Sequence, residues 1–180
     1  IEFNPAQVNS YRLIGYENRM LKKEDFANDR VDAGEIGAGH TVTALYEIVP
    51  VGAGEAGATA PAESKYLPRT VAAPLPAALA NELLTVKLRY KEPMGDVSRQ
   101  LEFPLTDRGK KFAEASADFK FAAAVASFGM VLRNSLYKGT ATLGEVVAWA
   151  AAGATDAASD IGGHRSEFIG LVREAQTLLR

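Results

Sequence analysis

The chain has 180 residues, 47% of them hydrophobic, which is enough apolar material for one sizeable core or two small layers. Its formal net charge of −2 argues against a nucleic-acid-binding surface, which usually carries a clustered basic excess. Cysteine is absent, so disulfides, thiol catalysis and thiolate metal ligands are excluded. The opening residues lack the basic segment and apolar run of a signal peptide.

The first half of the chain shows the alternation of apolar and polar residues that is typical of strands. Residues 11–17, 41–49 and 84–91 are the strand candidates, and Gly15 in the first of them indicates a bulge or a close backbone approach. Residues 92–96 are rich in turn formers and lead into a second alternating run, so we expect a hairpin. The predicted inward side chains of this hairpin are Leu84, Val86, Leu88, Tyr90, Leu101, Phe103 and Leu105. Pro104 lies on the outward set, which favours an edge strand.

Two segments between the strands are irregular. Residues 18–40 combine charges with apolar anchors and predict an ordered loop, with a helical turn around residues 22–26. Residues 52–81 are rich in Gly, Ala and Pro, and predict a long mobile excursion.

The period becomes helical from about residue 110. Residues 111–134 predict a helix that is apolar almost all round, in which Gly129 permits close approach of another backbone. Its longest apolar stretch, residues 121–132 in the C-terminal half, is too short to cross a bilayer, which needs roughly 20 residues. Thr142 and Glu145 have the spacing of a capping box at the start of a shorter helix. A last amphipathic helix is predicted over residues 164–179, with a buried set of Phe168, Leu171, Val172, Ala175, Leu178 and Leu179.

Together these patterns predict the α+β class. An antiparallel, β-sandwich-like region over residues 1–107 carries the 52–81 excursion, and a three-helix region over residues 108–180 packs on it as one structural unit.

The most conspicuous polar segment is the glycine-rich run from Asp32 to His40. A functional interpretation makes Asp32, Glu35, Gly37, Gly39 and His40 a loop that binds phosphate or a metal and serves a metal-dependent hydrolase. The run lacks the Gly-Lys-Ser/Thr ending of a P-loop and leads into a strand, so glycines that permit positive φ explain it more simply. A structure with His40 in a cleft within reach of Asp32 or Glu35 would favour the hydrolase.

Other catalytic patterns are weaker. His164 with Glu167 is a partial metal set, which capping or hydrogen bonding explains better. Ser98, Ser116 and Ser166 lie outside any Gly-x-Ser-x-Gly elbow, which argues against a serine hydrolase. The sequence therefore assigns no catalytic residue, metal ligand or cofactor.

Three strings carry a family resemblance: residues 8–20 with Asp25-Phe26, residues 32–47, and residues 119–133 with their Phe-Ala-Ala-Ala-Val-Ala-Ser-Phe-Gly-Met core. Together they resemble the domain of unknown function at the C-terminus of YfbK-type bacterial proteins, directly after a von Willebrand A domain. The resemblance spans almost the whole chain and weakens only over residues 52–81. The nearest string to the metal-binding motif of A domains, residues 96–100, lacks its last serine, so the A domain itself is not in this chain.

The resemblance implies a non-catalytic accessory or interaction module in a protein of the periplasm or cell envelope. Its implied partners are the upstream A domain of the same parent chain and an unidentified protein. Nucleic acid and membrane insertion by this segment are not expected. The metal-dependent hydrolase that uses the loop from Asp32 to His40 is the alternative.

Overall fold

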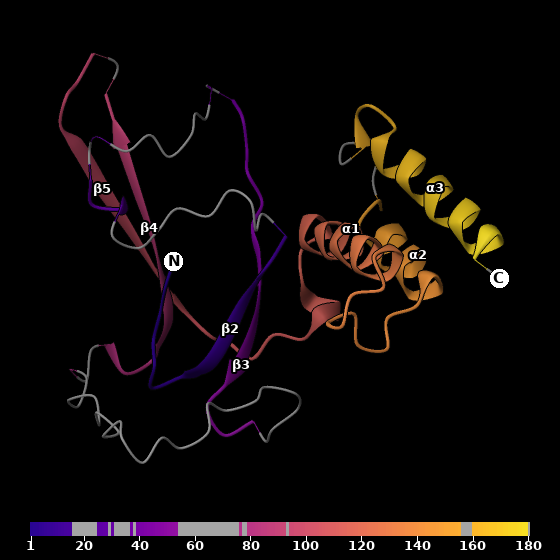
Figure 1. Ribbon diagram of the computed structural model, residues 1–180, viewed down its shortest axis with the longest axis horizontal. Coiled ribbons are helices and arrows are strands. Elements are labelled where there is room, and N and C mark those ends of the chain that lie inside the picture. The colour runs from indigo at the N-terminus through magenta and orange to yellow at the C-terminus, as the bar shows by residue number, and fades with distance from the viewer. Residues whose placement is uncertain are drawn as a thin grey trace. The chain divides into compact units, whose positions relative to one another are not determined.

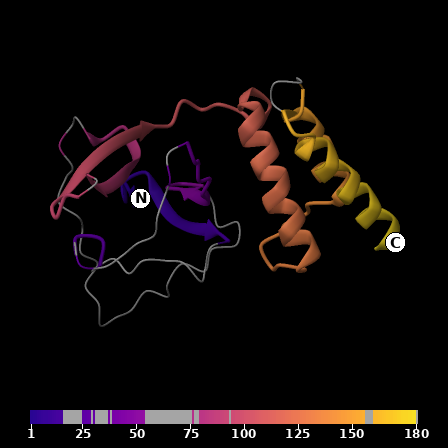
Figure 2. The same ribbon diagram turned by 90° about the horizontal axis from the view of Figure 1, so that it is seen from above.

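The computed structural model describes residues 1–15, 25–28, 30, 37, 39–53, 76, 79–92, 94–155 and 160–179. The chain divides into two compact units, residues 1–41 with 46–108 and residues 42–45 with 109–180. Strands in antiparallel sheets occupy the first unit and helices the second, which confirms the predicted α+β class (Figure 1 and Figure 2). The packing of the helical half on the strands stays a prediction.

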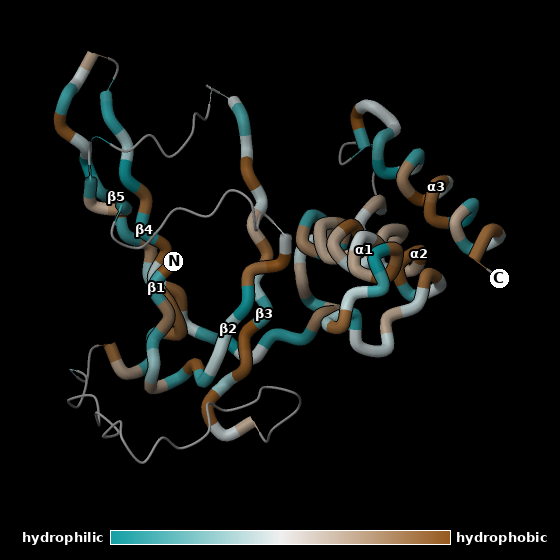
Figure 3. The backbone as a smooth tube through the Cα atoms, in the orientation of Figure 1, coloured by the Kyte–Doolittle hydropathy of each residue, from teal (hydrophilic) through white to brown (hydrophobic). Residues whose placement is uncertain are grey.

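A three-stranded antiparallel sheet contains β1 (Glu2–Phe3), β4 (Glu82–Lys91) and β5 (Ser98–Thr106) in the order β1-β4-β5. β4 and β5 form the predicted hairpin, with Leu84 opposite Leu105 and Leu88 opposite Leu101. β5 lies at the edge of this sheet, as Pro104 predicted. Figure 3 shows hydrophobic and hydrophilic segments alternating along both strands, as a two-faced sheet requires.

The second sheet pairs β2 (Val8–Ile14) with β3 (Leu45–Pro50). The backbone N–H of Val51 donates to the carbonyl of Gln7 at 2.9 Å, and Arg12 Nε donates to Glu47 at 3.1 Å, as in an antiparallel pair. Both strands differ from the predicted ranges. β2 ends before Gly15, so this glycine is not a bulge within the strand. β3 begins at Leu45, so residues 41–44 stay outside it.

An aromatic cluster connects the two sheets. The Phe3 ring stacks on Tyr11 with centroids 4.0 Å apart and lies 5.5 Å from the ring of Tyr46. Partial burial, and to a smaller extent the neighbouring Tyr11, raises the pKa of the Tyr46 hydroxyl. The cluster therefore favours an uncharged Tyr46 and joins β1 to the second sheet by apolar contact.

The predicted helix over residues 111–134 is two elements in the structure. A 3-10 turn (η4, Phe112–Glu114) precedes α1 (Ala117–Leu132). Ser116 separates them because its backbone is extended and its side chain accepts from the N–H of Phe119, as an N-cap does. Long apolar periodicity did not reveal this break, which depends on one serine.

The two later helices match the predicted ranges closely. α2 (Leu143–Ala152) begins with the predicted capping box: Thr142 Oγ1 accepts from Glu145 N–H at 3.3 Å, and the Glu145 carboxylate accepts from Thr142 N–H at 2.9 Å. α3 spans His164–Leu178. Within the described ranges, no helix combines the length and apolar character that a bilayer crossing requires.

The core of the helical unit is small. Its fully buried members are Ala124, Val146, Ala150 and Val172, and the rings of Phe121 and Phe128 meet Phe168 edge-on at 5.3 and 5.5 Å. The predicted burial of Leu171, Leu178 and Leu179 is wrong, because each is more than half exposed. The buried stripe of α3 follows Phe168 and Val172, and Leu171 and Leu178 lie seven residues apart on a different side of the helix.

Gly153, at the end of α2, supports close helix packing, whereas the predicted Gly129 does not. A Cβ built on Gly153 would lie 2.7 Å from the carbonyl oxygen of Ala117 and 2.7 Å from Cβ of Phe121. A Cβ on Gly129 would meet no atom within 4 Å. α2 can therefore end against the first turns of α1 only because residue 153 has no side chain.

We expect Gly153→Ala to lower the free energy of unfolding by about 1–3 kcal/mol, because its methyl group would force backbone atoms of α1 and α2 apart. Thermal or urea denaturation followed by circular dichroism measures the change. Gly129→Ala is the matched control, and it should raise the stability by about 0.5–1 kcal/mol because alanine is the better helix former. A Gly153→Ala protein as stable as the wild type would contradict the close packing.

Candidate functional site

The described part of the glycine-rich loop forms a turn around His40. The His40 N–H donates to the Gly37 carbonyl at 3.1 Å, and Gly39 has a φ of +79°, a backbone conformation that favours glycine. A Cβ on Gly37 would lie 2.9 Å from Nδ1 of His40, so the imidazole lies over residue 37. The glycines at 37 and 39 therefore have structural reasons to be glycine.

The described residues leave the predicted site at this loop untested. His40 is exposed, and Asp32 and Glu35 lie outside the described residues. The described ranges contain no group of three or more His, Asp or Glu side chains arranged to hold a metal. A metal site at Asp32, Glu35 and His40 thus stays a prediction.

The other candidate side chains have structural contacts. His164 and Glu167 are both exposed, with Nδ1 and Oε2 3.9 Å apart. Ser98 Oγ receives a hydrogen bond from Arg89, and Ser116 caps α1. Ser166 Oγ donates to Asp160 at 2.6 Å. Ser98 begins β5, Ser116 caps α1 and Ser166 lies in the first turn of α3, so each serine has a structural contact.

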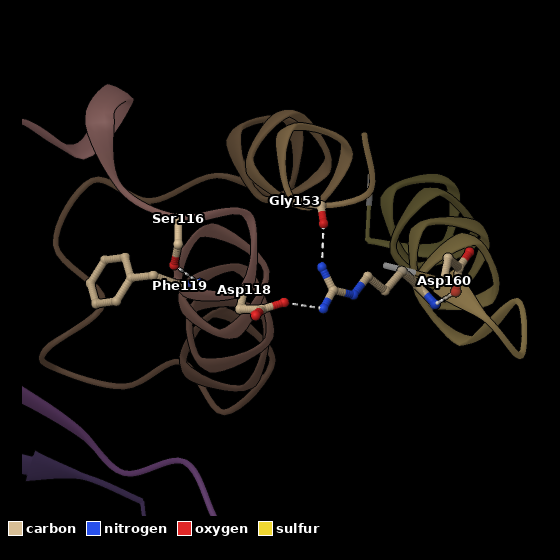
Figure 4. A network of polar contacts seen from close by, with 6 residues as sticks. Ser116, Asp118, Phe119, Gly153 and Asp160 are labelled. Carbon is tan, nitrogen blue, oxygen red and sulfur yellow. Dashed lines mark hydrogen bonds and ion pairs between the residues drawn. The ribbon is translucent and has the colours of Figure 1, made fainter. Parts of the chain in front are cut away.

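The most connected polar group in the helical unit is centred on Arg165, in the first turn of α3 (Figure 4). Its guanidinium donates to the Gly153 carbonyl at the end of α2 and to the Asp118 carboxylate in the first turn of α1. It also lies over the Phe121 ring, with Cζ 4.9 Å from the centroid. The Arg165 side chain is only 17% exposed. One side chain therefore contacts three helices.

Asp160 positions the start of α3 in the same network. Its carboxylate accepts from the N–H of Arg165 at 2.8 Å and from the N–H of Ser166 at 3.1 Å. The hydrogen bond from the Ser166 hydroxyl, followed by that from the Arg165 N–H, holds the pKa of Asp160 below its ordinary value. Gly163 is the N-cap of α3 and has no side-chain acceptor, so Asp160 supplies the anionic acceptor that the helix start favours.

This network acts as a brace between helices. The Arg165 guanidinium is held at once by a carboxylate, a carbonyl and an aromatic ring from the other helices. Sequence reasoning missed it because Asp118 and Arg165 are 47 residues apart. The one local signal was Asp160 ahead of a predicted helix start, which is a capping pattern.

The strand unit contains an open cavity of about 310 Å³ beside β1 and β4. Its polar lining includes Glu2, Glu82, Lys87 and Glu102. Lys87 Nζ pairs with Glu2 and lies 3.9 Å from Glu102. The hydrogen bond to Glu2 raises the pKa of the Lys87 ammonium, an effect larger than the opposing effect of burial. The cavity therefore has a paired cation at its wall.

We expect Asp160→Asn to lower the melting temperature at pH 7, because the amide replaces one of the two carboxylate acceptors. The folded-state pKa of Asp160 is depressed, so its contribution is present above the unfolded pKa near 4 and is lost as the pH falls through the folded value. The wild-type and variant melting curves should converge below pH 4 when scanned from pH 7 to pH 3. A gap that stays constant over this range would refute the assignment.

Comparison with known proteins places the chain in a family. The family model described as "Uncharacterized protein YfbK, C-terminal" matches residues 1–178. The chain is 39% identical over 175 residues to "Uncharacterized protein YfbK" of Escherichia coli (strain K12). The alignment covers 97% of this chain and 28% of that relative, so the chain spans little more than a quarter of the relative's length. No solved structure matches.

These two matches confirm the resemblance on which the sequence analysis relied. The matched residues include both the strand unit and the helical unit, with only residues 179–180 beyond the family model. The chain belongs to the YfbK C-terminal family.

Proposed function

We propose that the chain is a non-catalytic accessory and interaction module that follows a von Willebrand A domain in a bacterial cell-envelope protein. Its membership of a C-terminal family, in which the E. coli relative is more than three times as long, supports a place behind a larger upstream region. The A domain and the envelope setting come from the family resemblance of the three sequence strings.

The observation that carries the proposal is an open apolar face on α1, formed by Val125, Gly129 and Leu132. Val125 and Leu132 are seven residues apart and therefore point to the same side of the helix. They are 43% and 50% exposed, although Ser127 and Met130 on the opposite side of α1 are buried. The space beside Gly129, which lies between them, contains no atom within 4 Å.

An open apolar face of this kind suits contact with another protein. Single exposed apolar residues are ordinary, but neighbouring ones on a helix that is already packed on its other side are typical of an interaction surface. A glycine between two branched side chains leaves room for a partner's side chain. Docking of a partner would remove this apolar surface from water, which is the main driving force of protein association.

We expect the double substitution Val125→Ser with Leu132→Ser to abolish recovery of the partner when the tagged full-length protein is pulled down from its native cell extract. The changes remove apolar contact area without touching the buried core. Quantitative mass spectrometry of the captured proteins measures the loss. Arg173→Ser with Glu174→Ser, two exposed residues of α3, is the matched control and should retain the partner.

A truncated protein, from which residues 1–180 have been deleted, defines the baseline of the pull-down. A partner retained by the control and absent from both the double variant and the truncated protein supports the module. Equal recovery by all four proteins would show that neither the module nor its α1 face recruits a partner. Fractionation of the same cells tests the envelope setting, which requires the full-length protein in the envelope fraction.

A further inference from the structure

The hairpin of β4 and β5 has an apolar face that is largely open to solvent. We call it the hairpin face, and it consists of Val86, Leu88, Tyr90, Leu101, Phe103 and Leu105. The last five are between 42% and 52% exposed, although their alternation predicts the inward side of a sheet. Of the inward set that the sequence predicted, Leu84 alone is buried in the structure.

The opposite face of the same hairpin already has its partners. Lys87 pairs with Glu2 and Glu102 there. Arg89 donates to the Phe26 carbonyl at 2.6 Å and lies over the Phe26 ring. The polar face is thus occupied by contacts within the strand unit, while the face with the large apolar side chains is the more open one. An antiparallel sheet is normally buried on its apolar face, so the hairpin face is suited to a further layer of protein.

The position of β1 shows which edge of the sheet a preceding segment of the polypeptide would extend. Glu2 pairs with Thr85 and Phe3 with Leu84, so β1 uses only two of the ten residues of β4. Continuing this antiparallel register places Ile1 opposite Val86, and the residues before Ile1 opposite Lys87 and Leu88. The polypeptide that precedes Ile1 therefore reaches this sheet along β4, on the side away from β5.

We propose that the region preceding Ile1 in the full-length protein extends β1 along β4 over Val86–Leu88 and packs an apolar surface on the hairpin face. This inference rests on the proposed function, and it names the surface by which the module holds its upstream neighbour. The chain covers 28% of its E. coli relative and belongs to a C-terminal family, so most of such a protein precedes Ile1.

The upstream region of the same polypeptide is a better occupant than a second copy of the chain. It is tethered at Ile1, within the sheet itself, so its effective concentration at the hairpin face is in the millimolar range typical of short linkages. A second copy must instead associate from bulk solution and lose its translational freedom. Coverage of the face should therefore not depend on protein concentration.

Thiol labelling of the full-length protein tests this directly, because residues 1–180 contain no native cysteine and the labelled peptide is followed individually. Leu101→Cys places a thiol on the hairpin face, and Gln100→Cys places one on the adjacent residue of the opposite face. We expect maleimide to modify Leu101→Cys about tenfold more slowly than Gln100→Cys, because a covered thiol reacts only when the structure opens. Mass spectrometry of the peptide that contains residues 100–101 measures both rates. Leu88→Cys, on the facing strand, repeats the test at a second position.

Photocrosslinking from residue 101 identifies the occupant. A benzophenone amino acid at Leu101 should crosslink to residues that precede Ile1 in the same molecule, at all protein concentrations. Equal labelling of the two thiols, protection that appears only at high protein concentration, or crosslinks confined to residues 1–180 would each overturn the inference. If the two thiols are labelled equally while the α1 variant still loses the partner in the pull-down, this inference is refuted and the proposed function stands.

Discussion

The pairing of β4 with β5 is the contact on which the strand unit depends. Nine residue pairs join the two strands, from Glu82 opposite Thr106 to Lys91 opposite Ser98. Because side chains alternate across a strand, this register decides at once which residues share the polar face and which share the apolar face. β1 then adds to the free side of β4, and its Phe3 ring connects this sheet to Tyr11 and Tyr46 of the second sheet.

The two units both have small cores, and they differ in how much of their apolar surface is buried. The helical unit buries Ala124, Val146, Ala150 and Val172 completely and adds the Arg165 brace between its three helices. The strand unit buries Val8 and Leu84 and leaves most of its large hairpin side chains half exposed. A sheet with so much apolar surface in water gains stability from any further layer that covers it. This difference supports the proposal that the strand unit contacts the rest of the polypeptide.

Local signals were the reliable part of the sequence. The hairpin, the capping box at Thr142 and the start of α3 each depend on residues within a few positions of one another, so short-range chemistry was sufficient to predict them. The family resemblance came from three long strings and was also correct.

Features that depend on distant residues were missed or misjudged. The close contact at Gly153 and the Arg165 brace require α1, α2 and α3 to be assembled first, so no single segment of the sequence indicates them. The exposure of Leu171 and Leu178 likewise depends on which side of α3 meets its neighbours. The predicted loop site stays a prediction, because Asp32 and Glu35 lie outside the described residues.

The central claim is that the hairpin face and the adjoining part of β4 are covered in the full-length protein. Hydrogen–deuterium exchange of the backbone amides of residues 84–91 measures this most directly, in the full-length protein and in the 180-residue chain verified as folded by circular dichroism. The account predicts slower exchange at Lys87 in the full-length protein. The Leu83 carbonyl accepts from Asn4 of β1, so the backbone N–H groups of Thr85 and Lys87 point to the β1 side of β4, where an added strand would protect Lys87. Identical exchange of these amides in the two proteins would contradict it.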